Sequence, residues 1–321
     1  MKTERRIALA GNPNVGKSTV FNELTGSNQH TGNWTGKTVD LAEGCYYYKF
    51  NDYKLYDLPG TYSLVISSKE EEVARDFIES LDYECIVCVV DATNLERNLN
   101  LVLQISEITD RIVVLLNLCD EAKKRNIKIN CEKLSEMLGV PVVKATARSG
   151  RGINHLLEAV HNVITGNEKP KPKGITYISP IEQAAGVLER AGVERYKALR
   201  MLEDGKEPDD LKLKAAYMKA QGILERFNVS GDHFIESRTL SVFQKSDLIS
   251  KTVSEALPSK LEKREKILDK ILMGKYTAIP CMLLIFAVVL WITIAGSNYP
   301  SDFLRGVFDH FEIWLADVMT N

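Results

Sequence analysis

The order of apolar and polar positions divides the chain into three zones. In residues 1 to about 165, short runs of β-branched and apolar residues alternate with stretches whose apolar residues recur at helical spacing. Strands are predicted near 6–10, 45–50, 53–57, 84–91, 111–117 and 141–144, and helices near 17–26, 69–80, 96–108, 130–138 and 151–164. Such alternation is typical of an α/β domain with a mainly parallel sheet.

One stretch of this zone departs from the alternation. The segment "EGCYYYKFNDYKLYDLPG" contains two strand-like runs joined by a few polar residues, a pattern that favours a β-hairpin. We therefore expect a six-stranded, mainly parallel sheet with one antiparallel edge strand, in a domain that covers residues 1–166.

The second zone has a different pattern. It follows a Lys-Pro stretch, "GNEKPKPKG", whose prolines oppose regular structure, so residues 167–174 are predicted to be a linker. Residues 175–272 lack strand signals and carry helical runs such as "DDLKLKAAYMKAQGILERF". A small all-α domain is expected here.

The third zone is strongly apolar. Residues 277–296, "TAIPCMLLIFAVVLWITIAG", contain no charge and are long enough to cross a hydrocarbon core of about 30 Å, which predicts one transmembrane helix. A buried core helix is the alternative, but such a helix usually keeps a polar face. Lysine and arginine residues just before this segment place its N-terminal side in the cytoplasm. Residues 297–321 are predicted to form an amphipathic or partial second membrane segment.

Composition excludes some classes of protein. The 321 residues are 45% hydrophobic and carry a formal net charge of −2, so the chain is globular and has no overall basic character that would suit nucleic acid. No secretory signal precedes the first strand, and the first 270 residues are predicted to lie in a reducing compartment. Cys85 and Cys88 form a C-x-x-C, but they lie in the strand-like "ECIVCVVDA" and are interpreted as core residues rather than a redox or metal pair.

Candidate chemistry begins between the first strand and the first helix. In "GNPNVGKS", Gly11, Gly16, Lys17 and Ser18 fill the pattern G-x-x-x-x-G-K-[ST]. Glycines at this spacing let backbone N–H groups curl around phosphate oxygens, whereas an ordinary turn needs only one or two. Lys17 is expected to reach the β- and γ-phosphates and Ser18 to ligate Mg²⁺.

Three further motifs follow in order along the chain. In "DLPG", Asp57 is placed to hold Mg²⁺ and Gly60 to face the γ-phosphate. In "NLCD", Asn117 and Asp120 are placed to read guanine, because a carboxylate accepts hydrogen bonds from the guanine N1–H and 2-amino groups. A helix cap is the alternative role for Asp120. In "KATARSG", the Ala147 N–H is expected to contact the base oxygen.

This series of motifs resembles the translation-factor-like class of GTPases across residues 5–165. More narrowly, "GNPNVGKS" (11–18), "GNWTGKTV" (32–39) and "DLPGTYSL" (57–64) are similar to the ferrous iron transport protein family FeoB. That resemblance implies GTP hydrolysis to GDP with Mg²⁺, a regulatory helical domain that slows GDP release, and a transport region that starts near the third zone. It also implies a K⁺ ion held by Asn14 beside the phosphates.

The predicted site can now be given in full. The nucleotide contacts are assigned to the phosphate loop, a switch segment, the D-x-x-G segment and the two base-reading loops: Gly11, Asn12, Pro13, Asn14, Val15, Gly16, Lys17, Ser18, Thr19, Gly36, Lys37, Thr38, Asp57, Leu58, Pro59, Gly60, Asn117, Leu118, Cys119, Asp120, Thr146, Ala147 and Arg148. The predicted Mg²⁺ ligands are Ser18, Thr38 and Asp57, with Thr31 and Thr35 as alternatives to Thr38. The residues predicted to act in hydrolysis are Asn14, Lys17, Thr38 and Gly60.

The expected function follows from the motifs and the resemblance together. They imply a membrane-tethered GTPase of the cytoplasmic membrane, the bacterial inner membrane, with its GTPase and helical domains in the cytoplasm, that drives or gates ferrous iron uptake. Its partners would be guanine nucleotide, ferrous iron, the lipid bilayer, and the remaining transporter helices or a homo-oligomer, with no nucleic acid. A GTP-dependent switch that signals to a membrane or ribosomal partner without transport is the alternative.

Overall fold

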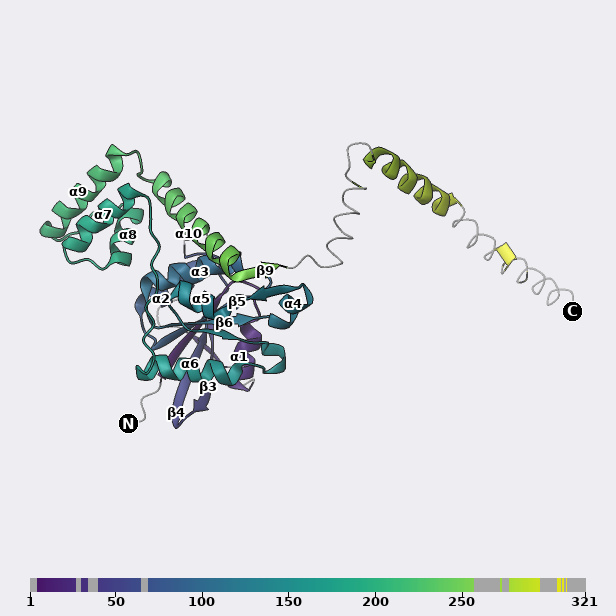
Figure 1. Ribbon diagram of the computed structural model, residues 1–321, viewed down its shortest axis with the longest axis horizontal. Coiled ribbons are helices and arrows are strands. Elements are labelled where there is room, and N and C mark those ends of the chain that lie inside the picture. The colour runs from purple at the N-terminus through teal and green to yellow at the C-terminus, as the bar shows by residue number, and fades with distance from the viewer. Residues whose placement is uncertain are drawn as a thin grey trace, which may run out of the picture. The chain divides into compact units, whose positions relative to one another are not determined.

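The computed structural model describes residues 5–26, 30–33, 40–64, 69–256, 272, 277–294, 305, 306, 308 and 310. The chain forms two compact units, Met1–Leu257 and Pro258–Asn321. The first unit contains an α/β domain and a group of helices (Figure 1).

A seven-stranded sheet lies at the centre of the α/β domain, in the order β2-β3-β4-β1-β5-β6-β8. Its strands are β1 (Arg5–Gly11), β2 (His30–Asn33), β3 (Asp40–Tyr48), β4 (Asn51–Asp57), β5 (Cys85–Asp91), β6 (Ile112–Asn117) and β8 (Val142–Lys144). Five of them, β4, β1, β5, β6 and β8, are parallel to one another, while β3 is antiparallel to both β2 and β4. The mainly parallel sheet with an antiparallel strand at one edge is thus confirmed, and the short β2, which the sequence did not predict, makes seven strands instead of six.

The predicted hairpin is formed by β3 and β4. Its turn lies at Lys49 and Phe50, whose φ angles of 44° and 63° are both positive, as the tight turn between right-twisted strands requires. The strand expected near 45–50 therefore ends at Tyr48 and begins earlier, at Asp40.

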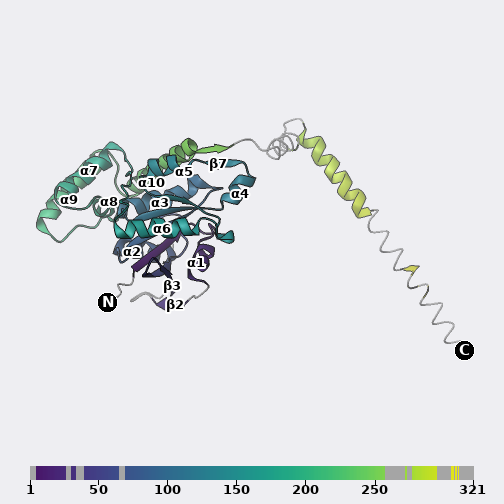
Figure 2. The ribbon, with the colours of Figure 1, turned by 60° about the horizontal axis from the view of Figure 1, so that its bottom comes forward.

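Helices cover both faces of the sheet (Figure 2). They are α1 (Lys17–Thr25), α2 (Lys69–Ser80), α3 (Leu95–Ile108), α4 (Cys119–Lys124), α5 (Cys131–Leu138) and α6 (Ile153–Thr165). One apolar core joins the sheet to α1 and α6, and the other joins it to α2, α3 and α5. Burial on both faces explains why the central strands are almost continuously apolar.

The two cysteines of the C-x-x-C pattern point into different cores. Cys85 lies in the core beside α1 and α6, and Cys88 lies in the core beside α2 and α3. Both are buried, and burial raises the pKa of each thiol. The prediction of core cysteines is confirmed, and no group of potential metal ligands occurs among the residues described.

A group of helices follows the α/β domain in the same compact unit. It consists of α7 (Ser179–Arg190), α8 (Arg195–Asp204), α9 (Leu211–Arg226) and α10 (Asp232–Val253). The helix α10 packs along α3, so the core on that face of the sheet continues into the helices. After α10, β9 (Ser254–Ala256) pairs antiparallel with β7 (Ile127–Ile129), a short strand that the sequence did not predict.

Among the described residues of the second unit, residues 278–294 form one continuous helix. Its apolar side chains are exposed, among them Ile279, Phe286 and Trp291. No helix in the described ranges is long and apolar enough to cross a membrane. The transmembrane helix predicted over 277–296 is therefore not found among the described residues, and Ala295 and Gly296 lie outside them. Most of the segment predicted at 297–321 lies outside the described residues.

Candidate nucleotide-binding site

The phosphate loop connects the end of β1 to the start of α1 and lines a cavity of about 550 Å³. The loop is shaped by two residues with positive φ, Asn14 at 65° and Gly16 at 83°. Left-handed residues among right-handed ones turn successive backbone N–H groups toward one side, which creates a concave anion site. The cavity wall consists of Asn12, Pro13, Asn14, Gly16, Lys17, Ser18, Thr19 and Gly60. All eight belong to the predicted nucleotide site.

The two glycines of the loop are required for different reasons. A Cβ added at Gly11 would lie 2.6 Å from the Val89 carbonyl oxygen, so the close approach of β1 to β5 excludes a side chain there. Gly16 combines its positive φ with a close neighbour, because an added Cβ would lie 2.5 Å from Asn117 Nδ2. The glycine spacing of the motif thus reflects packing as well as phosphate access.

The substitution Gly16→Ala tests this packing, with Gly26→Ala as the matched control. Gly26 also has a positive φ, at 62°, but a Cβ there would meet nothing within 4 Å. We expect Gly26→Ala to lower the free energy of unfolding by about 1–2 kcal/mol, the cost of a left-handed alanine. Gly16→Ala should cost about 1 kcal/mol more, because it displaces the Asn117 amide from its hydrogen bond. Urea unfolding of both variants measures the difference, and equal losses would contradict the packing argument.

Lys17 and Asp57 meet at the edge of this cavity. The Lys17 ammonium group forms an ion pair with Asp57 Oδ1, and both side chains are nearly buried. Burial raises the pKa of Asp57, and the nearby Lys17 charge opposes that shift. The two residues that the sequence assigns to phosphate and Mg²⁺ therefore neutralise each other here. The Asp57 carboxylate, paired with Lys17, and the Ser18 hydroxyl of the cavity wall are both oxygen donors of the kind that Mg²⁺ takes.

The D-x-x-G segment packs directly on the phosphate loop. The Leu58 N–H donates to the Leu9 carbonyl oxygen at 3.0 Å, and the Thr61 N–H donates to the Gly11 carbonyl oxygen at 3.3 Å. A Cβ at Gly60 would lie 3.2 Å from the Pro13 backbone, so glycine permits this close approach.

Thr61, which follows the D-x-x-G motif, is buried, and its side chain is already engaged. Its hydroxyl donates to the Ser63 carbonyl oxygen at 2.5 Å and lies 3.3 Å from Glu71 Oε1. The hydroxyl is therefore held within its own loop and α2.

Asn117 connects the phosphate loop to a base-reading loop. This buried side chain donates from Nδ2 to the Val15 carbonyl oxygen at 2.9 Å and accepts at Oδ1 from the Ala147 N–H at 3.0 Å. The Ala147 N–H, which the sequence assigns to the base oxygen, bonds here to the buried Asn117 amide oxygen, which needs a donor. Its contact with a base stays a prediction. Asn117 thus acts here on the protein's own loops.

The other members of the guanine motif lie at the start of α4. Leu118 has a positive φ of 58° and stands before the helix, and Asp120 is exposed in its first turn. No side-chain capping bond closes this helix end. Thr146 and Arg148 flank Ala147 in the facing loop, where a 3-10 helix spans Ala147–Ser149.

Part of the predicted site lies outside the described residues. Gly36, Lys37 and Thr38 lie outside the described residues, as does Thr35, so the choice of switch threonine stays a prediction. Two residues that the sequence did not indicate do join the site's surroundings. Gln104 accepts hydrogen bonds from the Leu64 N–H at 2.7 Å and the Ser63 hydroxyl at 3.1 Å. Arg97 lies over the Tyr62 ring, 4.0 Å from its centroid.

Comparison with known proteins agrees with these motifs. Residues 5–160 match the family model of ferrous iron transport protein B. The Fe(2+) transporter FeoB of Salmonella typhimurium is 34% identical over 343 residues, covering 97% of this chain and 43% of the relative. Its counterpart in Escherichia coli K12 is 35% identical over 315 residues, covering 92% of this chain and 39% of the relative. The chain therefore spans less than half the length of these curated relatives.

Solved structures show the same relationship. A GDP-bound mutant of the S. thermophilus FeoB G-domain superposes with a TM-score of 0.69 at 31% identity, covering 78% of this chain and all of that one. The cytosolic domain of T. maritima FeoB, in a GDP form, superposes with a TM-score of 0.67 at 30% identity, covering 79% of this chain and all of that one. With the phosphate loop, the D-x-x-G segment and the guanine motif all in place, the chain belongs to the FeoB family, and its α/β domain is a GTPase domain of that family.

Proposed function

We propose that this chain binds GTP, hydrolyses it to GDP and phosphate, and so drives or gates ferrous iron uptake as part of a longer transporter. The observation that carries this proposal is the contact between three parts of one site. Asn117 joins the phosphate loop to the base-reading loop, and the Lys17–Asp57 pair joins the phosphate loop to the D-x-x-G segment. The names of the curated relatives, Fe(2+) transporters, support the link to iron.

Each residue of the site has a role that follows from its chemistry. Lys17 exchanges its carboxylate partner for the β- and γ-phosphates when nucleotide enters, because a phosphate oxygen offers the same charge-assisted bond. Asp57 then becomes available with Ser18 and Thr38 to hold Mg²⁺, which supplies charge neutralisation of the phosphates when bound. The Gly60 N–H contacts the γ-phosphate. Because Thr61 supplies no amide to orient the attacking water, unaided hydrolysis should be slow.

Asn14 is proposed to hold K⁺ beside the phosphates. It lines the phosphate cavity, its side chain is exposed there, and the amide supplies the oxygen ligand that such a cation takes. A cation at this position would offset charge that develops between the β- and γ-phosphates during hydrolysis. The alternative is that Asn14 only shapes the loop, since asparagine tolerates a positive φ.

The K⁺ role predicts hydrolysis about tenfold faster in K⁺ than in Na⁺ at equal ionic strength, which corresponds to about 1.4 kcal/mol of transition-state stabilisation. Asn14→Ala should abolish the difference, but alanine is strained at φ 65°. Asn14→Gly is the better test, because glycine keeps the backbone conformation and removes only the amide. Phosphate release measured in the two salts decides the question. A salt effect that survives in Asn14→Gly would rule out the amide as ligand.

The chain is proposed to act at the cytoplasmic membrane of a bacterium, with its GTPase domain (1–166) and helical domain (175–272) in the cytoplasm and 167–174 as their linker. The exposed apolar side chains of helix 278–294 support this location, because such a surface favours lipid or further protein as its surroundings. The remaining transporter helices or a second copy of the chain would supply the protein part of these surroundings.

A signalling switch without transport is the second candidate. It is favoured by α3, which connects the site to the helical domain: Gln104 binds the segment after D-x-x-G, and Glu107 pairs with Arg238 of α10 at 3.2 Å. Fe²⁺ uptake into vesicles that contain the longer transporter separates the two candidates. GTP-dependent uptake that is lost in Lys17→Ala supports transport. Uptake that does not depend on GTP supports the switch.

A further inference from the structure

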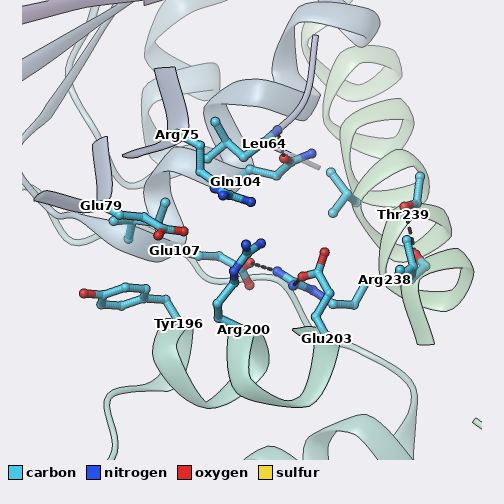
Figure 3. Close-up of a pocket in the computed structure, with 13 residues that line it drawn as sticks. Leu64, Arg75, Glu79, Gln104, Glu107, Tyr196, Arg200, Glu203, Arg238 and Thr239 are labelled. Atoms are coloured by element: carbon cyan, nitrogen blue, oxygen red, sulfur yellow. Dashed lines mark hydrogen bonds and ion pairs between the residues drawn. The ribbon is translucent and has the colours of Figure 1, made fainter. Parts of the chain in front are cut away.

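A second cavity, lined by charged, polar and apolar side chains, lies between the GTPase domain and the helical domain (Figure 3). It measures about 60 Å³ and is walled by α2 and α3 on one side and by α8 and α10 on the other. None of its described lining residues belongs to the phosphate cavity. Leu64 and Gln104 line it, so it adjoins the end of the segment that follows D-x-x-G.

Arg75 of α2 points into this cavity without adequate partners. The residue is 7% exposed, and its Nε and Nη1 atoms have no hydrogen-bond partner. Its ion pair is a long one, 3.4 Å from Nη2 to Asp76 Oδ1. Because a guanidinium group carries five N–H donors, leaving part of it buried and unpaired is costly. This arrangement calls for an acceptor in the cavity.

Arg200 of α8 brings a second guanidinium group to the same space. Figure 3 shows the Arg75 and Arg200 side chains directed toward one another across the cavity. Arg200 pairs through Nε with Asp204, one turn along its own helix, at 3.1 Å. Two like charges that face each other in a partly buried space repel. An anion between them would attract both guanidinium groups and offset this repulsion.

The carboxylates of the cavity do not supply that anion. Glu107 and Glu203 both pair with Arg238, and Glu107 also accepts a hydrogen bond from the Tyr177 hydroxyl at 2.8 Å. Glu79, the remaining carboxylate, forms no ion pair within 4.0 Å with a described residue. Burial raises its pKa, against the opposing effect of Arg200 and Arg75. The two arginines therefore keep free donors.

We propose that this cavity binds a small oxyanion between the Arg75 and Arg200 guanidinium groups. Its volume of about 60 Å³ exceeds the roughly 10–15 Å³ that a single water needs, so it has room for a small oxyanion such as inorganic phosphate or a short carboxylate. The planar fork of arginine matches two oxygens of either ligand. The bound anion joins α2, the helix after the D-x-x-G segment, to α8 of the helical domain.

Calorimetric titration of the full chain with inorganic phosphate, and separately with acetate, tests the proposal. The protein is first saturated with a non-hydrolysable GTP analogue and Mg²⁺, so that the phosphate loop is filled. Arg75→Met and Arg200→Met should each weaken binding at least tenfold, because each removes a charge-assisted pair of hydrogen bonds. Arg226→Met is the matched control: Arg226 is exposed at the end of α9, and its loss should leave binding unchanged.

The outcomes distinguish phosphate from a carboxylate as the ligand, and a variant that does not fold from a proposal that is wrong. Binding of phosphate alone identifies a tetrahedral oxyanion, and binding of acetate alone identifies a carboxylate; both support the site. If Arg75→Met does not fold, Arg200→Met decides, because Arg200 is the more exposed of the two. Absence of binding, or binding equally strong in Arg200→Met and Arg226→Met, overturns the proposal. These results do not depend on whether GTP drives transport.

Discussion

Replacing Asn117 with alanine should lower the free energy of unfolding by about 3–5 kcal/mol and weaken guanine-nucleotide binding at least tenfold. The amide makes two buried hydrogen bonds, to the Val15 carbonyl oxygen and from the Ala147 N–H. Alanine leaves both backbone groups unpaired in the interior, and each such group costs about 1–3 kcal/mol. Nucleotide binding suffers as well, because the phosphate loop and the base-reading loop lose the side chain that sets their separation.

Asn98→Ala is the matched control for this prediction. Asn98 is also buried in the α/β domain and also makes two hydrogen bonds, from the Asp91 N–H at 3.3 Å and to the Asn94 carbonyl oxygen at 2.8 Å. Its loss should lower stability without a matching loss of nucleotide affinity. Urea unfolding and titration with a fluorescent GDP analogue, measured below the unfolding transition, provide both quantities. Equal affinity losses in the two variants would show that Asn117 acts through stability alone.

The sequence predicted the sheet well because its central strands are buried on both faces. A run such as "CIVCVVD" in β5 has few alternatives to an interior strand. The missed elements are short, and their formation depends on distant partners. The three residues of β7 become a strand by pairing with β9, which follows the last of the four helices α7–α10, and β2 exists through its pairing with β3. Propensity within such short segments carries too little information to predict them.

The candidate site also has parts that the sequence predicts and parts that it does not. The phosphate loop could be predicted because its glycines, lysine and serine are contiguous and their spacing has a chemical meaning. The role of Asn117 as a connection between loops could not, because its partner Val15 lies 102 positions away and only the sheet brings them together. Gln104 and Arg97 lie on a helix of ordinary composition, so no motif in the sequence around them identifies them as part of the site. The facing arginines of the second cavity come from two domains and have no sequence signal.

Replacing Asp120 with asparagine should weaken GDP and GTP binding by about 2–4 kcal/mol and shift preference toward xanthine nucleotides. The carboxylate is proposed to accept hydrogen bonds from the guanine N1–H and 2-amino groups. An amide at this position presents a donor, which suits the carbonyl group that xanthine carries in place of the amino group. Because Asp120 is exposed and caps no helix through its side chain, the change should barely alter folding.

Glu121→Gln separates base recognition from a general charge effect. Glu121 is the neighbouring acid in the first turn of α4, so both variants lose one favourable interaction with the positive end of that helix, worth about 0.3–1 kcal/mol. Base recognition belongs to Asp120 alone, and only Asp120→Asn should prefer xanthosine diphosphate over GDP in a competition titration. If the two variants lose GDP affinity equally and neither gains affinity for the xanthine nucleotide, Asp120 acts only on the helix. In that case guanine is read by another part of the site, and the Asn117–Ala147 loop is the next place to search.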